Sequence, residues 1–120
     1  MAKILIIDDS VVARLSLKAC LPKDTHQLLE AADGLQGVAL FTTERPDITF
    51  LDLTMPGMDG AEALRQIRTA DAHARVIILT ADIQRKTIER VMQLGAYAVI
   101  KKPPSQEAVL TELNRALAGA

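Results

Sequence analysis

The chain has 120 residues, of which 49% are hydrophobic and 24% are charged, and its formal net charge is −1. This length suits one domain, residues 1–120, with a core large enough to need no disulfide or metal to hold it together. The balanced charge argues against a surface that binds nucleic acid or a membrane by bulk electrostatics, and the composition argues against disorder.

The first predicted strand follows the N-terminus almost directly. Residues 3–7, "KILII", are almost wholly apolar and too few for a helix, which is typical of a buried strand. Because no signal-peptide pattern precedes them and no apolar run approaches the roughly 20 residues of a membrane span, we expect a cytoplasmic protein. Ser10 can then cap a helix that runs to about Leu21 and stops at Pro22.

The single cysteine and the two histidines are not predicted to carry chemistry. Cys20 excludes an internal disulfide, and it lies on the apolar face of the first helix, where a small buried hydrophobic residue is a better interpretation than a nucleophile. His26 and His73 have no cysteine, histidine or acid at metal-ligand spacing, so we expect both at the surface.

The second and third strands are separated by another helix. "QLLEA" (27–31) is a weaker strand signal, and a helix opens after Asp33 and ends near "ERP". The third strand, "DITFLD" (47–52), is almost entirely apolar before its final acid. A loop then leads through Gly60 into a helix over residues 61–70.

The same alternation continues to the end of the chain. Residues 75–80 form a fourth apolar strand, a fourth helix is predicted over 83–94 with Gly95 just beyond its end, and residues 97–100 form the fifth strand. The last helix has the clearest periodicity, on an apolar face formed by Val109, Leu110, Leu113, Ala116 and Leu117.

Strict alternation of strands and helices predicts an α/β fold. The strands should be parallel and joined by right-handed crossovers, with helices on both faces of the sheet, which explains why the strands are apolar throughout. The common five-stranded form of this doubly wound, flavodoxin-like fold has strand order 2-1-3-4-5. Its ligand crevice lies beyond the carboxyl ends of strands 1 and 3.

Acidic residues stand at both of those strand ends. Asp8 and Asp9 follow the first strand, and Asp52 ends the third. Unit charges about 4 Å apart repel by roughly 4 kcal/mol per pair at an effective dielectric constant near 20, so this edge needs a compensating charge such as a hard divalent cation. Thr80 ends the fourth strand and Lys102 follows the fifth, which completes a site suited to a cation and an anion.

Each of these residues also has an ordinary structural explanation. Asp8 and Asp9 could be acids that the dipole favours at a helix N-terminus, and Asp52 could begin a loop. Thr80 could cap a strand end, and Lys102 could be a solvated surface residue. Their joint occurrence at one edge of the predicted sheet favours the functional interpretation.

Four motifs stand at the predicted strand ends: "IIDDS", "LDLTMPGMDGAE", "ILTA" and "GAYAVIKKP". In their order and spacing they resemble the receiver domain of two-component response regulators, in particular single-domain members of the chemotaxis-regulator type. The resemblance covers essentially the whole chain and implies a phosphoacceptor signalling domain rather than an enzyme. A stand-alone regulator and a receiver from a longer protein fit equally well.

The resemblance implies a role for each acid. Asp52 would accept a phosphoryl group from a sensor histidine kinase or a histidine phosphotransfer protein, in a reaction that requires Mg²⁺ (or Mn²⁺). Asp9 would bind the metal directly, Asp8 mainly through a coordinated water, and Thr54 through its backbone carbonyl, with Asp52 completing the set.

The resemblance also implies how the phosphoryl group would be held and lost. Thr80 would donate a hydrogen bond to it, and Lys102 would pair with it, after a cis peptide bond to Pro103. Thr54 and Asp82 lie two residues beyond the acceptor and the hydroxyl, where they would flank the path of the attacking water and tune dephosphorylation. Asp82 could equally be a helix N-cap.

The output surface is expected on the face formed by the fourth helix, fifth strand and fifth helix, where a downstream protein, rather than nucleic acid or a membrane, would bind. Many receivers have an aromatic switch residue where this chain has Val99, and an apolar residue such as Phe where it has Pro104. Tyr97 is expected on the same strand face as Val99. The predicted output residues are Arg85, Lys86, Glu89, Arg90, Val99 and Lys101.

Three competing functions fit the sequence less well. A phosphatase or phosphotransferase of the haloacid-dehalogenase type also uses a strand-end aspartate and Mg²⁺, but it requires a second aspartate where this chain has Thr54. A nucleotide- or flavin-binding module should have a glycine-rich loop after the first strand, where "DDSVVA" stands. A degenerate receiver usually lacks an acid, the hydroxyl or the lysine, and all are present.

Overall fold

The structure, a computed structural model, describes residues 2–23, 26–55 and 57–119, and within them five strands alternate with five helices. The strands are β1 (Ala2–Ile7), β2 (His26–Ala31), β3 (Ile48–Asp52), β4 (Val76–Thr80) and β5 (Ala98–Lys101). The helices are α1 (Val11–Cys20), α2 (Gly34–Glu44), α3 (Gly60–Ala70), α4 (Arg85–Gln93) and α5 (Gln106–Ala118).

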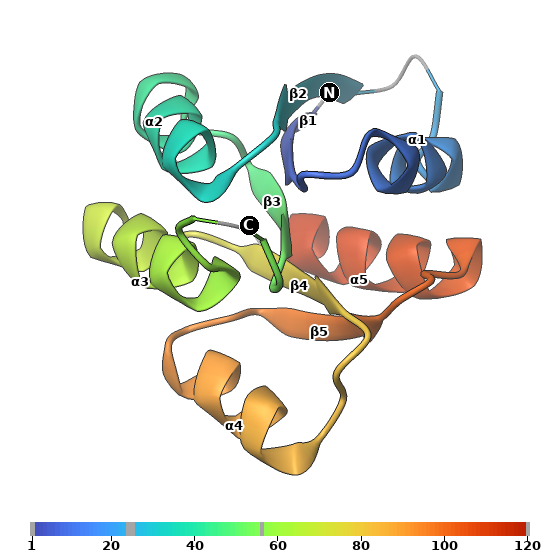
Figure 1. The fold of residues 1–120 in the computed structure, drawn as a ribbon. Coiled ribbons are helices and arrows are strands. Elements are labelled where there is room, and N and C mark those ends of the chain that lie inside the picture. Colours follow the sequence, from blue (N-terminus) through green and yellow to red (C-terminus); the bar gives the residue numbers. More distant parts are fainter. Residues whose placement is uncertain (1, 24–25, 56, 120) are drawn as a thin grey trace.

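The strands form one parallel sheet in the order β2-β1-β3-β4-β5, which confirms the predicted fold class (Figure 1). Ile7 pairs with Leu51, Asp52 with Leu79, and Thr80 with Lys101. This register brings the carboxyl ends of the four strands β1, β3, β4 and β5 to one edge of the sheet. The predicted site residues therefore come from segments far apart in sequence.

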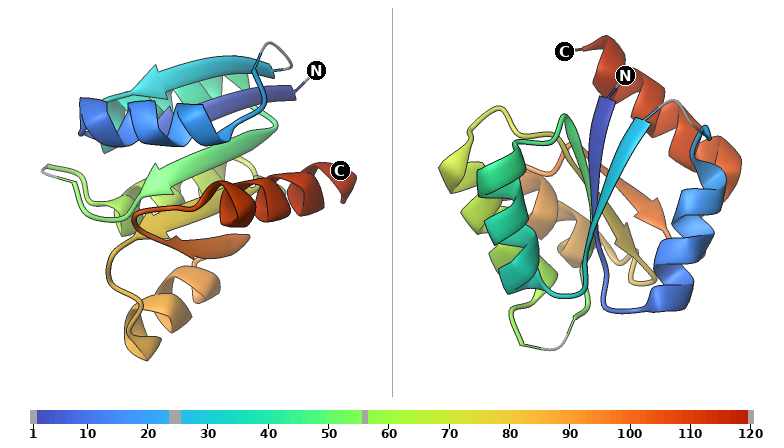
Figure 2. Two further views of the ribbon diagram at one scale, coloured as in Figure 1. Left: turned by 90° about the vertical axis from the view of Figure 1, so that its right-hand side faces the viewer. Right: turned by 90° about the horizontal axis from the view of Figure 1, so that it is seen from above.

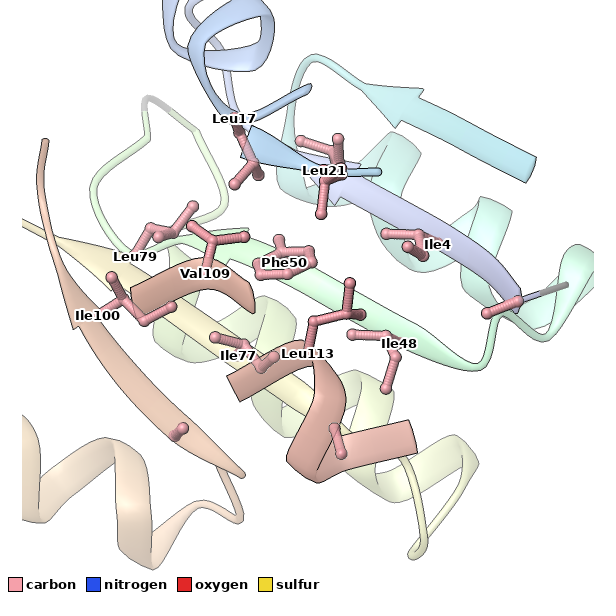
Figure 3. Close-up of a cluster of buried hydrophobic side chains, with 14 residues drawn as sticks. Ile4, Leu17, Leu21, Ile48, Phe50, Ile77, Leu79, Ile100, Val109 and Leu113 are labelled. Atoms are coloured by element: carbon pink, nitrogen blue, oxygen red, sulfur yellow. The ribbon is translucent and has the colours of Figure 1, made fainter. Parts of the chain in front are cut away.

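Two layers of helices cover the sheet (Figure 2). α1 and α5 pack on one face around Phe50, Val109 and Leu113, as the close-up in Figure 3 shows. α2, α3 and α4 lie on the other face, over Leu51 and Ile78. Both faces of β3 and β4 are buried, so apolar and polar residues do not alternate along these two strands. In the described residues, no helix is long and apolar enough to cross a membrane.

Side chains cap the N-termini of four helices as the sequence favours. Ser10, Asp33, Asp59 and Ser105 each accept a hydrogen bond from the backbone N–H three residues ahead. α4 differs, because the side chain of its N-cap residue, Gln84, makes no capping hydrogen bond. The backbone that leads into α4 is therefore positioned by contacts other than an N-cap side chain.

The prediction that the fourth helix begins at residue 83 is wrong by two residues. The carboxylate of Asp82 accepts a hydrogen bond from the backbone N–H of Gln84, which closes a turn, so the helix begins only at Arg85. Asp82 precedes the cap position and is not the N-cap. The other end of the helix is confirmed, because Gly95 follows the C-cap with φ of +102°, a conformation that glycine adopts readily.

The surface position predicted for His26 is only partly confirmed. His26 is half-buried, because it pairs with Ala2 across β1 and β2, and its Nδ1 atom accepts a hydrogen bond from the Ala2 N–H at 3.2 Å. His73 is exposed as predicted, and the partly buried Cys20 packs against the cluster between α1 and α5.

Candidate functional site

Three carboxylates meet at the carboxyl edge of the sheet. Asp8 and Asp52 are buried, with 2% and 4% of their surface exposed, whereas Asp9 is exposed. One oxygen from each residue lies within 4.8 Å of the others. The strand order therefore brings together the acids that the sequence places at two separate strand ends.

Backbone and side-chain donors hold Asp8 in position. Its Oδ1 atom accepts a hydrogen bond from the Ser10 N–H at 2.9 Å, and its carbonyl accepts one from the Arg14 guanidinium at 2.6 Å. Ser10 also caps α1, so the start of that helix and the position of the acid are fixed by the same short turn. The sequence indicated the cap but not the contact made by Arg14.

The loop after Asp52 requires glycine at its far end. A Cβ atom on Gly60 would lie 2.5 Å from the carbonyl oxygen of Asp52 and from the Cα atom of Leu53. The Gly60 N–H also donates to the Leu53 carbonyl, and α3 begins at that residue. The loop thus leaves β3 and returns to within contact of its end, which keeps Thr54 beside the Asp52 carboxylate.

Lys102 pairs with two of the three acids. Its ammonium lies 2.9 Å from Asp8 Oδ2 and 3.1 Å from Asp52 Oδ1. The backbone N–H of Lys102 donates to the Thr80 carbonyl, which continues the pairing of β4 with β5 by one residue. The peptide bond from Lys102 to Pro103 is cis, as the resemblance implied.

Burial and charge act in opposite directions on the acids and the lysine. Burial raises the pKa of the Asp52 carboxyl, and the Asp8 carboxylate raises it further, against the lowering effect of Lys102. Burial favours the neutral amine of Lys102, but hydrogen bonds to Asp8 and Asp52 outweigh this effect and raise its pKa. The lysine is therefore ionised, and the site retains an excess of negative charge.

The donor set suits a hard divalent cation. All three side chains offer carboxylate oxygens, the ligands that Mg²⁺ and Mn²⁺ prefer. Ligand oxygens about 2.1 Å from a Mg²⁺ ion lie roughly 3–4 Å from one another, which is compatible with the 4.8 Å limit that encloses this group. Such a cation would offset the charge that Lys102 leaves uncompensated.

Thr80 and Thr54 lie at the same edge of the sheet. Thr80 is buried, and its Oγ1 atom accepts a hydrogen bond from the Asp82 N–H at 3.0 Å. The Thr54 N–H makes a long contact of 3.4 Å with Asp52 Oδ1. The carboxylate of Asp82 bonds the Gln84 N–H and also accepts from the Thr87 hydroxyl at 2.7 Å. The contact made by Thr87 was not predicted from the sequence, because an i, i+5 pair is not a standard helix-surface spacing.

The predicted output residues lie on α4 and β5. Those on α4 and Lys101 are exposed, and Arg85 pairs with Glu89 at 2.7 Å. Val99 is half-buried on the α4 side of the sheet. Tyr97, however, does not share its face: it precedes β5 and packs on the opposite side, where the guanidinium of Arg115 lies 5.8 Å from the ring centre. The alternation expected for a strand does not extend to Tyr97, because β5 begins at Ala98.

Comparisons with known proteins agree with this geometry. A family model described as "Response regulator receiver domain" matches residues 4–114. The chain is 41% identical over 122 residues to Protein PilH of Pseudomonas aeruginosa, covering 99% of this chain and 100% of that protein. It is also 42% identical over 101 residues to Sporulation initiation phosphotransferase F of Bacillus subtilis, covering 84% of this chain and 82% of that protein.

A solved structure extends the likeness to three dimensions. The fold matches a chain in the crystal structure of the CheX-CheY-BeF3-Mg²⁺ complex from Borrelia burgdorferi with a TM-score of 0.91 and 31% sequence identity. The match covers 97% of this chain and 89% of the other. The similarity in fold and in sequence therefore extends along nearly the whole chain.

Proposed function

The chain belongs to the response regulator receiver domain family, whose members are phosphoacceptor signalling domains, and we propose that Asp52 is its phosphoryl acceptor. The observation that carries the proposal is the position of its carboxylate, which is buried beside Asp8 and 3.1 Å from the Lys102 ammonium. We assign the receiver domain to residues 1–120. In support, β1 begins at Ala2 and α5 ends at Ala118, just outside the matched range.

The chemistry asks little of the protein beyond position and charge. Phosphoryl transfer depends mainly on in-line placement and on neutralisation of the oxygens. An Asp52 oxygen would form the new O–P bond while the P–N bond breaks in a phosphohistidine of a sensor histidine kinase or a histidine phosphotransfer protein. Lys102, ionised beside the acceptor, would offset the charge that the phosphoryl group brings.

The metal that fits this donor set is Mg²⁺, or Mn²⁺. We assign Asp9 as a direct ligand, Asp8 as a ligand mainly through water, and Asp52 and the Thr54 carbonyl as the remaining protein ligands. When bound, the ion would supply positive charge to the phosphoryl oxygens. The close grouping of the carboxylate oxygens supports this assignment.

The signal would leave the site through Thr80. A phosphoryl group adds about −1.5 to −2 charges and three acceptor oxygens at Asp52. In the structure the Thr80 hydroxyl oxygen accepts a hydrogen bond from the Asp82 N–H, so the hydroxyl proton can be donated to one of these phosphoryl oxygens. Val99 is β-branched and too short to act as an aromatic lever, so we assign the response to the loop after Thr80 and to α4.

A downstream protein would read this response on the face formed by α4, β5 and α5. The side chains exposed there are mostly basic, which favours a partner with acidic groups. Val99 lies beside them and would couple the face to the sheet. The exposed charged residues that α4 and β5 contribute to this face are Arg85, Lys86, Glu89, Arg90 and Lys101.

The acceptor can be tested with acetyl phosphate and with beryllofluoride, each in the presence of Mg²⁺. Wild type should be modified or bound, and Asp52→Asn should show neither. Asp33→Asn is a matched control, because asparagine caps a helix as well as aspartate does, so α2 should remain intact and labelling unchanged. Stable labelling of Asp52→Asn, or full labelling of wild type in EDTA, would refute the assignment.

Asp82 is also expected to influence the lifetime of the phosphoryl group. A carboxylate near the path of the attacking water could orient it, so Asp82→Ala should slow the decay of phosphorylated protein. The measurement is loss of label after the phosphodonor is removed. Decay that is unchanged or faster in Asp82→Ala would leave Asp82 with only its role in the turn before α4.

A further inference from the structure

A chain of three hydrogen bonds connects the Thr80 hydroxyl to α4 through one residue. The Asp82 N–H donates to Thr80 Oγ1 at 3.0 Å, and the two carboxylate oxygens of Asp82 accept from the Gln84 N–H at 3.0 Å and from the Thr87 hydroxyl at 2.7 Å. Gln84 precedes α4, and Thr87 lies in its first turn. The backbone of Asp82 therefore contacts Thr80, while its side chain holds the start of α4.

The start of α4 has few other attachments. Its N-cap residue makes no side-chain capping bond, and among its described residues only Val91, near the far end, is buried. Thr87 is half-buried and, together with Val91 and Met55, lines a cavity of about 230 Å³ beneath the helix. The first turn is thus positioned by polar contacts rather than by close packing, so the Asp82–Thr87 bond has a large influence on where the helix lies.

The chemistry of the pair fixes the direction of the bond. Hydrogen bonds from the Gln84 N–H and from Thr87 lower the pKa of the Asp82 carboxyl, so at neutral pH it is an ionised acceptor and the hydroxyl is the donor. Removing the Thr87 hydroxyl should therefore remove this bond without disturbing the turn that Asp82 makes with Gln84.

The geometry points to a latch, formed by Asp82 and Thr87, that holds Thr80 and α4 in the arrangement adopted before phosphorylation. This inference rests on the proposed function of Asp52. For Thr80 to donate to a phosphoryl group, its hydroxyl must turn toward Asp52, and the Asp82 N–H then loses its acceptor or moves with it. Either change releases or shifts the backbone of Asp82, and its carboxylate then moves away from Thr87. Thr87 is thus a positioning residue that stabilises only the resting state.

The latch predicts that its removal favours the activated state. A bond that forms only in the resting state stabilises that state and so lowers the population of the activated state, which binds a phosphoryl mimic. The apparent affinity for the mimic falls by the same factor as that population. One net hydrogen bond changes such an equilibrium by about two- to tenfold. Thr87→Val, which keeps the shape and removes the hydroxyl, should therefore bind beryllofluoride about two- to tenfold more tightly than wild type at saturating Mg²⁺.

A matched control exists on α3. The Thr69 hydroxyl also donates a hydrogen bond, but to the carbonyl of Arg65 in its own helix. Thr69→Val should leave the beryllofluoride affinity at the wild-type value, and Thr87→Ser, which restores a donor, should return it toward wild type. Thr87→Ala is a second variant in case valine disturbs the cavity, and it should change affinity in the same direction as Thr87→Val.

Two further measurements distinguish a latch from a simple helix cap. Backbone amide NMR shifts of α4 in Thr87→Val with Mg²⁺ alone should move toward the positions that wild type adopts with beryllofluoride. The effects of Thr87→Val and Asp82→Ala on affinity should be non-additive, because both remove the same bond. Affinity equal to wild type in Thr87→Val, or weaker, would overturn the latch. Failure of wild type to bind beryllofluoride would instead overturn the proposed function.

Discussion

Helices α3 and α4 cover the same face of the sheet, on either side of β4, but they are attached to it very differently (Figure 1). α3 is capped by the side chain of Asp59 and buries a row of residues that includes Leu64 and Ile67. In α4 only Val91 is buried, and the cap residue, Gln84, makes no side-chain bond. Their sequences already differ in this way, since "RKTIERVMQ" has few apolar positions.

Under the proposed function, this difference would separate a part of the site that stays fixed from a part that responds to phosphorylation. α3 begins at Gly60, in contact with the end of β3, so its packing helps to hold the Asp52 loop. α4 follows Thr80 and is held at its start mainly by the hydrogen bonds of Asp82. A receiver needs both properties, because the acceptor must stay in place while another surface changes.

The largest expected effect comes from truncating the same residue type in each helix. Ile67 of α3 is fully buried, whereas Ile88 of α4 is half-buried. Ile67→Ala should lower the free energy of unfolding by about 2–5 kcal/mol, and Ile88→Ala should cost about half of that or less, because less apolar surface is lost. Urea unfolding of both variants provides the measurement. Equal costs would contradict the contrast between the helices.

A smaller effect on stability is expected from removing the charge of the Asp52 carboxylate. The folded state raises the pKa of Asp52, so its carboxylate is destabilising above that pKa, and this cost disappears as the pH falls below the unfolded value. Asp52→Asn should therefore raise the free energy of unfolding in EDTA at neutral pH, with a gain that shrinks in acid. Unfolding of both proteins across a pH series tests the sign. A gain that grows in acid would be the opposite of this expectation.

The smallest effect on stability is expected at the surface of α4. Arg85 and Arg90 are exposed, and the exposed pair of Arg85 with Glu89 contributes at most about 1 kcal/mol. Arg85→Glu/Arg90→Glu should change the free energy of unfolding by no more than about that amount, yet abolish phosphorylation-dependent partner binding. Pull-down with and without beryllofluoride measures this. Partner binding that survives the reversals would place the output surface elsewhere.

Much of the fold could be predicted because its signals are local. Apolar runs marked the strands, and Ser10 and Asp33 are caps that can be identified from the sequence. Alternation of the elements then determined the topology, and the topology placed Asp8 beside Asp52. The site was predictable because its residues stand at strand ends, where the parallel order alone brings them together.

The features that were predicted wrongly depend on one local turn and on two contacts between distant residues. The predicted start of α4 was two residues too early, because the Asp82 carboxylate accepts a hydrogen bond from the Gln84 N–H. Tyr97 lies on the face opposite the predicted one, because it stands just before β5 and its ring contacts Arg115 of α5. His26 is half-buried because Ala2, on the neighbouring strand, is its partner. The pairs that involve Tyr97 and His26 join residues far apart in the sequence, so they could not be matched without the tertiary structure. The Asp82–Gln84 bond spans two residues, and there a local turn competed with the helix start.

The ion pair between Lys102 and Asp8 joins residues 94 positions apart, and this separation matters when the chain is synthesised. During synthesis, Asp8 and Asp52 emerge from the ribosome long before Lys102. Until β5 pairs with β4, the early strands carry closely spaced acids without that ammonium. Nascent chains that end before Lys102 should therefore assemble β1 beside β3 less readily, and added Mg²⁺ should assist them more than it assists the finished protein.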